Sequence, residues 1–261
     1  MRIPLTTHDF KRTFKDLGYE SRELGYSFGT MLSAPESNPK LKKNLKKGVM
    51  SQPLHLAHAN TAGYGNVCPK ASIQCAKFCL DEAGNPMFLP NKLEARKQRT
   101  KMFFKHKKLF FTRLFKEIKV AKNRADKAGM QCGLRLNATS DLNWENYYIG
   151  GKNLMEWFPT IEFYDYTAVA NRVTPSNYHL TFSLKEDNFD TAMAEFKRGL
   201  NIAIPFKTKR IQEIPKTWNG IEVIDGDEHD FRPLDKPNTI VGLTVKGNMD
   251  MNSPFFQELT A

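Results

Sequence analysis

Three of the chain's four cysteines lie within one stretch of twelve residues, after a short apolar segment. Cys68, Cys75 and Cys79 have the spacing C-x6-C-x3-C. Thiolates gathered this closely usually share a metal ion or a cluster, and three ligands leave one coordination position open for chemistry. Structural zinc sites usually contain C-x2-C pairs, which are absent here, whereas a wider loop suits a larger cluster. The spacing favours an iron–sulfur cluster; the alternatives are a zinc ion that also binds His55 or His58, or three unliganded thiols.

A second candidate site is the acidic segment D-G-D-E-H-D at residues 225–230, which holds five potential ligands in six residues. Carboxylates in a turn can hold a divalent cation or act as general acids and bases, and a histidine titrates near neutral pH. A solvated turn explains the same residues, because Asp and Gly are ordinary turn residues. We expect four of these side chains to bind substrate or move protons: Asp225, Asp227, His229 and Asp230.

The elements that must position these residues form a series of strands with several intervening helices. Strands are predicted at residues 53–60, 133–139, 161–167, 178–184, 201–206, 221–225 and 239–245. Apolar residues occupy both odd and even positions of these strands, as in a parallel sheet that is buried on both faces. We expect an α/β fold with a partial or closed (β/α) barrel-like parallel sheet, and a doubly wound open sheet is the runner-up. Residues 1–50 are predicted to be an N-terminal extension with a basic stretch, and residues 51–261 the barrel-like domain.

The strand order predicts where the chemistry collects. In parallel α/β folds, active sites lie at the C-terminal ends of the strands. The cysteine loop follows the first strand, and the acidic segment follows the sixth. Asp141, Asp165, Tyr166 and Lys185 end or follow the strands between them, so we expect them to bind substrate or move protons at the same edge. Cys132 precedes the second strand, at the opposite end, and is predicted to be an inert buried thiol.

Positive charge is concentrated in one segment. The formal net charge is +11, and residues 92–127 contain fourteen Lys and Arg against three acidic residues, which accounts for the whole surplus. One long helix is predicted over residues 91–128, with its aromatic side chains in the core. Its lysines form either a solubilising face or a surface that binds nucleic acid. The lysines concerned are Lys101, Lys105, Lys108, Lys116 and Lys119.

Composition and missing motifs exclude several classes of protein. The chain is 40% hydrophobic and 26% charged, which is typical of a globular protein. It has no apolar run of the roughly 18 residues that a membrane span needs and no signal-peptide apolar region. We therefore expect a cytoplasmic protein with reduced thiols and no membrane partner. A phosphate-binding loop, a nucleophile elbow and motifs for base-specific readout are absent.

Four segments occur here in combination: the cysteine loop, R-L-N-A-T-S-D at 135–141, F-Y-D-Y-T at 163–167 and D-G-D-E-H-D at 225–230. Over roughly residues 40–250, this combination resembles an uncharacterised family of phage and phage-like proteins. The resemblance implies expression in the cytoplasm of a bacterial host and no assigned activity. The cysteine loop is also similar, in architecture, to that of radical S-adenosylmethionine enzymes. There, three cysteines after the first barrel strand, spaced C-x3-C-x2-C, hold a [4Fe–4S] cluster whose open iron binds S-adenosylmethionine.

The leading interpretation is a phage metalloenzyme with a three-cysteine iron–sulfur site that acts on nucleic acid or a nucleotide. It would use a [4Fe–4S] cluster, with or without S-adenosylmethionine. One alternative is a non-enzymatic protein that binds nucleic acid or a host partner, with a structural zinc ion in the cysteine loop. Another is a metal-dependent nuclease that uses Asp225, Asp227 and Asp230 with Mg²⁺. The sequence predicts no oligomeric state.

Overall fold

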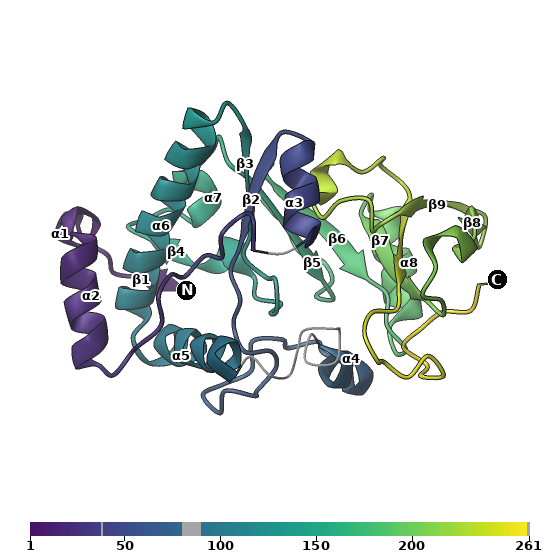
Figure 1. Ribbon diagram of the computed structural model, residues 1–261, viewed down its shortest axis with the longest axis horizontal. Coiled ribbons are helices and arrows are strands. Elements are labelled where there is room, and N and C mark those ends of the chain that lie inside the picture. Colours follow the sequence, from purple (N-terminus) through teal and green to yellow (C-terminus); the bar gives the residue numbers. More distant parts are fainter. Residues whose placement is uncertain (38, 80–89, 260–261) are drawn as a thin grey trace.

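The computed structural model describes residues 1–37, 39–79 and 90–259 (Figure 1). Its centre is a sheet of eight strands in the order β2-β3-β5-β6-β7-β10-β9-β8. All neighbouring strands are parallel except β8 and β9, which are antiparallel. The strands are β2 (Val49–Pro53), β3 (Gln131–Arg135), β5 (Glu162–Thr167), β6 (Tyr178–Ser183), β7 (Asn201–Phe206), β8 (Thr217–Trp218), β9 (Ile221–Asp225) and β10 (Ile240–Thr244).

The α/β class and the mostly parallel sheet are confirmed. Five parallel strands, from β2 to β7, stand side by side in chain order. Three helices that follow strands in the chain, α6 (Lys107–Lys127), α7 (Leu154–Trp157) and α8 (Phe189–Lys197), bury side chains against the same face. When successive right-handed crossovers advance in the same direction along a sheet, their helices lie on one face. In a doubly wound sheet the direction reverses, so helices cover both faces. Among the described residues no pairing joins β2 to β8, so the sheet is open and not a closed barrel.

The predicted basic helix is two helices. Figure 1 shows α5 (Pro90–Lys105) and α6 pointing in different directions. His106, between them, has φ −133° and ψ 56°, and its Nδ1 lies 2.6 Å from the hydroxyl oxygen of Tyr26. The prediction of one helix was wrong because a contact between residues so distant in sequence leaves no mark on helical periodicity. The aromatic core is confirmed, since these rings are buried: Phe103, Phe110, Phe111 and Phe115.

The two faces of the sheet have different coverings. On the α6 face, Cys132 is 3% exposed, and burial raises the pKa of its thiol to about 12, as expected of an inert cysteine. The other face is covered by α3 (Pro39–Lys46) and by a short helix, η3 (Arg232–Leu234). Phe231 packs there so closely on Gly133 that a Cβ at this glycine would lie 2.9 Å from the ring. Only glycine permits this approach of ring to strand.

The first fifty residues pack on both faces of the sheet. β1 (Arg2–Ile3) pairs with β4 (Tyr148–Ile149), and α1 (Thr7–Lys11) and α2 (Phe14–Glu23) lie against α6, whereas α3 lies against β2. The division at residue 50 stays a prediction. The other short helices are α4 (Ile73–Phe78), η1 (Trp144–Asn146) and η2 (Ile211–Glu213). Within the described ranges, no helix has the length and apolar character needed to cross a bilayer.

Candidate functional site

A cavity of about 730 Å³ lies on the α3 face of the sheet, where the parallel strands end. Side chains alternate between the faces of a strand, so each strand sends only every second residue into it. α3 and the cysteine loop also contribute to the wall, through Lys40 and Cys79. Six strands or their ends contribute side chains, among them His55, Arg135, Tyr166, Ser183, Pro205 and Leu243. The cavity therefore lies at the C-terminal ends of the strands, where the strand order predicted the functional residues.

Asp227, from the acidic segment, lies in this cavity between two lysines. Its carboxylate is 3.0 Å from Lys40 Nζ and 2.6 Å from Lys246 Nζ, and it accepts a hydrogen bond of 2.7 Å from the Thr244 hydroxyl. Burial raises the pKa of Asp227, but the two lysines and this hydroxyl outweigh burial and hold the pKa well below its usual range. Asp227 is thus a permanent anion that fixes the two lysines, and it is unsuited to proton transfer near neutral pH.

Asp230 forms a buried ion pair with Arg135 at the end of β3. Arg135 Nη1 lies 3.0 and 3.1 Å from the two carboxylate oxygens, and the Tyr164 hydroxyl donates to the same carboxylate at 3.3 Å. Burial raises the pKa of Asp230, but the positive charges of Arg135, Lys40 and Arg232 together outweigh it and the pKa stays below its usual range. The Arg135 guanidinium also lies 4.7 Å from the centre of the Tyr166 ring. The cavity thus contains a fixed cation stacked on an aromatic ring.

The cysteine loop is held by hydrogen bonds within the loop and from the segment that follows β2. Cys68 Sγ accepts a hydrogen bond of 3.4 Å from the Ala59 backbone N–H, and Ser72 caps α4 by accepting one of 3.1 Å from Cys75 N–H. Burial raises the pKa of Cys68 to about 11 and also raises that of Cys75. All three cysteines are half-buried and form no disulfide, and Cys79 lines the cavity. Across the described ranges, no three His, Cys, Asp or Glu side chains are already grouped as metal ligands.

Two histidines stand near this loop. Burial, together with nearby arginines, lowers the pKa of His55 to about 3, so its imidazole is neutral at physiological pH. Its Nδ1 is buried and has no hydrogen-bond partner among the described residues, although His55 lines the same cavity as Cys79. His58 is 7% exposed. A neutral imidazole with an unsatisfied nitrogen is the form of histidine that binds metals.

Asp165 and Asp141 lie outside this cavity, so their expected place beside Tyr166 is corrected. Asp165 and Tyr166 are consecutive in β5 and therefore face opposite sides of the sheet. Asp165 accepts hydrogen bonds of 2.7 Å from both the Asn137 N–H and the Tyr178 hydroxyl, and burial raises its pKa to about 7. Asp141 accepts from the Thr167 hydroxyl and the Ala168 N–H at 2.7 and 2.8 Å. Their contacts join the strand ends to one another.

Three other predicted residues support the site without lining the cavity. Lys185 is 5% exposed and donates to the Lys70 carbonyl oxygen, which ties the cysteine loop to the end of β6. Asp225 is exposed and accepts a hydrogen bond of 2.7 Å from the Asp227 N–H, which orders the acidic turn. His229 is 7% exposed, lies 3.6 Å from Asp235 and has a pKa that burial lowers.

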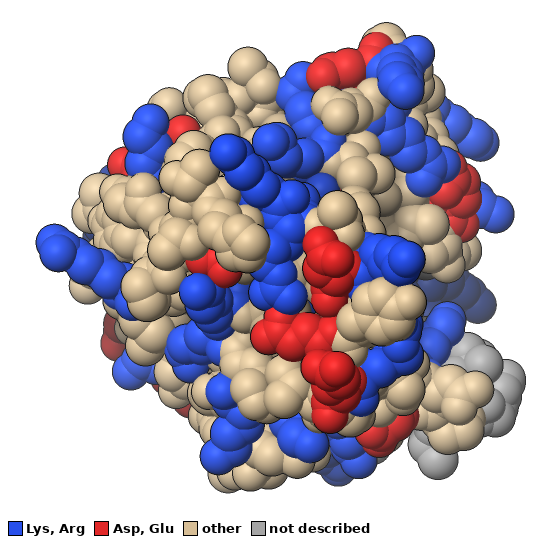
Figure 2. Space-filling model, turned by 90° about the vertical axis from the view of Figure 1, so that its left-hand side faces the viewer, with Lys and Arg blue, Asp and Glu red and all other residues tan. Residues whose placement is uncertain are grey.

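The predicted lysine stripe is divided between two helices. Lys108 forms an ion pair of 3.1 Å with Asp9, and Lys116 donates to the Phe10 carbonyl oxygen at 3.3 Å, so two of these lysines hold the N-terminal segment. Figure 2 shows Lys and Arg spread over one side of the molecule around a band of Asp and Glu. On that face the acidic side chains separate groups of Lys and Arg from one another. The predicted lysines are Lys101 and Lys105 on α5, and Lys108, Lys116 and Lys119 on α6.

Sequence reasoning missed the contribution of α3 and of Arg135 to the cavity. Lys40 and Lys43 lie in the basic stretch that was assigned to an N-terminal extension, and only the fold brings them to the acidic segment. Lys43 Nζ donates to the Asp227 carbonyl oxygen at 2.6 Å. The ion pair of Arg135 could have been predicted from the sequence, because a charged residue inside an otherwise apolar strand needs a buried partner.

The segments described above lie within the range matched by a known protein family. The model of a family described as Gene product 88 matches residues 30–256, a range that includes the cavity and the cysteine loop. No curated protein and no solved structure matches the chain. The match confirms the expected family and covers most of the chain: this protein belongs to the Gene product 88 family.

Proposed function

We propose that this protein is an iron–sulfur enzyme whose cluster is held by Cys68, Cys75 and Cys79 at the mouth of the central cavity. Its substrate would be a nucleotide or a nucleic acid end bound against Arg135 and the lysines of α3. The observation that carries the proposal is the position of Cys79, which lines the same cavity as the ion-paired acidic segment. A redox centre and a polar substrate pocket would then share one wall.

The donor set suits such a cluster. Cysteine thiols are the ligands that iron–sulfur clusters use, and none of the three on this loop forms a disulfide. When bound, the cluster would supply electron transfer or an open iron to which S-adenosylmethionine could bind. Because burial raises the pKa of Cys68 and Cys75, both thiols must release protons on ligation, and cluster uptake should be pH-dependent. Lys185 lowers the pKa of Cys75 in part, and so assists that release.

The charges of the cavity support an anionic substrate. Lys40, Lys43, Arg135 and Lys246 face it against Asp227 and Asp230, an excess of two positive charges. The ring of Tyr166 under the Arg135 guanidinium offers a surface for a flat group, since bases stack on aromatic and guanidinium planes. These residues would bind and orient the substrate.

Metal analysis of anaerobically purified protein tests the cluster. We expect iron and acid-labile sulfide, about four of each per chain for a [4Fe–4S] cluster, and visible absorption that dithionite bleaches. Cys68→Ser, Cys75→Ser and Cys79→Ser should each lose most of the iron. Cys132→Ser is the matched control and should keep it, because Cys132 lies at the other end of β3. Protein that takes up neither iron nor sulfide after anaerobic reconstitution would refute the proposal.

Calorimetric titration with AMP and with a short single-stranded oligonucleotide tests the substrate pocket. Lys43→Ala should weaken binding several-fold, and the salt dependence of the affinity should fall with it. Lys42→Ala is the matched control, because Lys42 is exposed on the same helix and does not line the cavity. Equal losses in the two variants would place the anion elsewhere.

A second candidate is a structural zinc ion in place of the cluster. The unsatisfied Nδ1 of neutral His55 favours it, because a fourth ligand would close the coordination shell. One equivalent of zinc that survives anaerobic preparation, and that His55→Ala releases, would support this alternative. Iron and sulfide retained in His55→Ala would support the cluster.

A further inference from the structure

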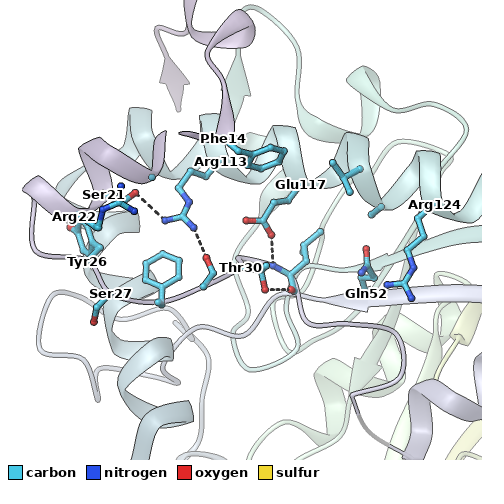
Figure 3. Close-up of a pocket in the computed structure, with 16 residues that line it drawn as sticks. Phe14, Ser21, Arg22, Tyr26, Ser27, Thr30, Gln52, Arg113, Glu117 and Arg124 are labelled. Atoms are coloured by element: carbon cyan, nitrogen blue, oxygen red, sulfur yellow. Dashed lines mark hydrogen bonds between the residues drawn. The ribbon is translucent and has the colours of Figure 1, made fainter. Parts of the chain in front are cut away.

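A second recess, of about 650 Å³, lies on the other side of β2, between α2 and α6 and beneath residues 26–32 (Figure 3). It shares no lining residue with the central cavity. Its volume falls in the range of sites that bind small organic molecules. The proposed function does not use it.

One end of the recess is polar. Gln52, on β2, is 9% exposed, and no hydrogen bond reaches its side-chain amide from the part of the chain that the structure describes. Figure 3 shows this amide beside the guanidinium of Arg124 from α6. Because this amide has no partner among the described residues, its N–H groups can donate to a ligand. Arg124 adds a positive charge at the same end.

The charged side chains at the centre of the recess already have hydrogen-bond partners. Glu117 accepts hydrogen bonds from the Met31 and Leu32 N–H groups at 2.8 to 3.0 Å, and Arg113 donates to the Gly29 carbonyl oxygen at 2.6 Å. These groups fix residues 29–32 as one wall. The charged lining residues are Arg22, Arg113 and Arg124 against Glu117, which leaves an excess of two positive charges.

The remaining wall is apolar and open to solvent. Phe14 of α2 is 51% exposed and Val120 of α6 is 52% exposed, and both line the recess. Phe28 and Leu32 extend this surface inward. Exposed apolar side chains that line a concave site are typical of ligand-binding surfaces. The recess thus pairs an apolar wall with a cationic end.

We propose that this recess binds a small organic anion that joins an apolar body to a carboxylate or a phosphate monoester. The anionic group lies against Arg124 and the Gln52 amide, and the body covers Phe14 and Val120. Arg124 now pairs with Glu36 at 2.7 Å, but both side chains are 48% exposed. Exposed pairs of this kind are weak, so the ligand displaces Glu36 at little cost.

Calorimetric titration of the full chain with octanoate and octyl phosphate tests this site, and octan-1-ol is the uncharged control. We expect both anions to bind at least ten-fold more tightly than octan-1-ol. Val120→Trp, which fills the recess from an exposed position, and Arg124→Ala should each weaken binding at least ten-fold. Glu36→Gln removes the competing carboxylate and should strengthen it several-fold. Lys127→Ala, at the exposed end of α6, is the matched control.

Three results would overturn the proposal: failure of both anions to bind, equal binding of octan-1-ol, or unchanged affinity in Val120→Trp and Arg124→Ala. Phe14→Ser provides a second test of the apolar wall should the tryptophan variant fold poorly. The outcome is separable from that of the proposed function. A Cys68→Ser protein without iron should bind octanoate as the parent chain does.

Discussion

Asp165 and Tyr166 are neighbours at the end of β5, but they belong to two different regions. Asp165 lies in a buried network on the α6 face, where it accepts hydrogen bonds from the Asn137 N–H and the Tyr178 hydroxyl. Tyr166 faces the cavity with its ring under Arg135 and has room beside it. A polar residue at the C-terminal end of a parallel strand is therefore a candidate for chemistry only if its side chain lies on the face of the sheet that borders the cavity.

The two regions also handle charge differently. The α6-face network buries Glu145 against Arg172, whose side chains are 6% and 2% exposed, with Asp141 3.7 Å from the same guanidinium. The cavity holds more cations than anions, and Lys40 and Lys246 keep 36% and 42% of their side chains exposed. The first arrangement stabilises the strand ends. The second leaves positive charge available to a ligand.

The largest effect on stability is expected from the network. Arg172→Leu leaves Glu145 buried without its cation, so the free energy of unfolding should fall by about 3 to 5 kcal/mol. Urea denaturation followed by circular dichroism measures the loss. The double variant Arg172→Leu, Glu145→Leu removes both charges and should recover much of it. A loss below about 1 kcal/mol in the single variant would mean that the network does not carry the structural role assigned to it.

Asp165 should make the folded protein less stable as pH rises, which is the opposite of the usual effect of a carboxyl group. Its pKa is raised by burial to about 7, whereas an unfolded Asp titrates near about 4. Between these values the folded state binds one more proton, so stability falls as pH rises, by about 1.4 kcal/mol per pH unit from this group. Asp165→Asn should flatten that slope. Urea midpoints at several pH values measure it, and an unchanged slope would contradict the raised pKa.

Lys246→Ala probes the cavity and should cost less. Asp227 keeps Lys40, so we expect a loss of about 1 kcal/mol or less near neutral pH. Because the pKa of Asp227 is held low, this stabilisation is present above the unfolded pKa of about 4 and disappears as pH falls through the folded value. AMP affinity should drop several-fold in the same variant. A loss of stability as large as that of Arg172→Leu would erase the distinction between the regions.

The smallest effect on stability is expected at the lysines of α5 and α6. Lys105→Glu and Lys119→Glu change exposed residues, so the free energy of unfolding should move by about 0.5 kcal/mol or less. Oligonucleotide binding measured at two salt concentrations is the sharper readout. Weaker binding with a reduced salt slope would support a nucleic-acid surface on these helices. Unchanged binding would restrict the nucleotide proposal to the cavity.

Periodicity and composition were enough to predict the α/β class, the parallel sheet and the aromatic core of α6. They also placed the cysteine loop and the acidic segment at one edge, and Cys79, Asp227 and Asp230 do share a cavity. The separation of Asp165 from Tyr166 was available in principle, because adjacent strand residues face opposite sides. The arrival of α3 over the cavity and the break at His106 depend on tertiary contacts, which no local pattern encodes.

The edge strand β2 has a mechanical consequence. Gln52 and Pro53 are consecutive, and one faces the recess while the other lines the cavity. The wall between the two hollows is therefore a single extended backbone, paired with a full strand only on its β3 side. A shift of that backbone toward one hollow would narrow that hollow and widen the other. Occupants on opposite sides of β2 would then compete through the strand without touching each other.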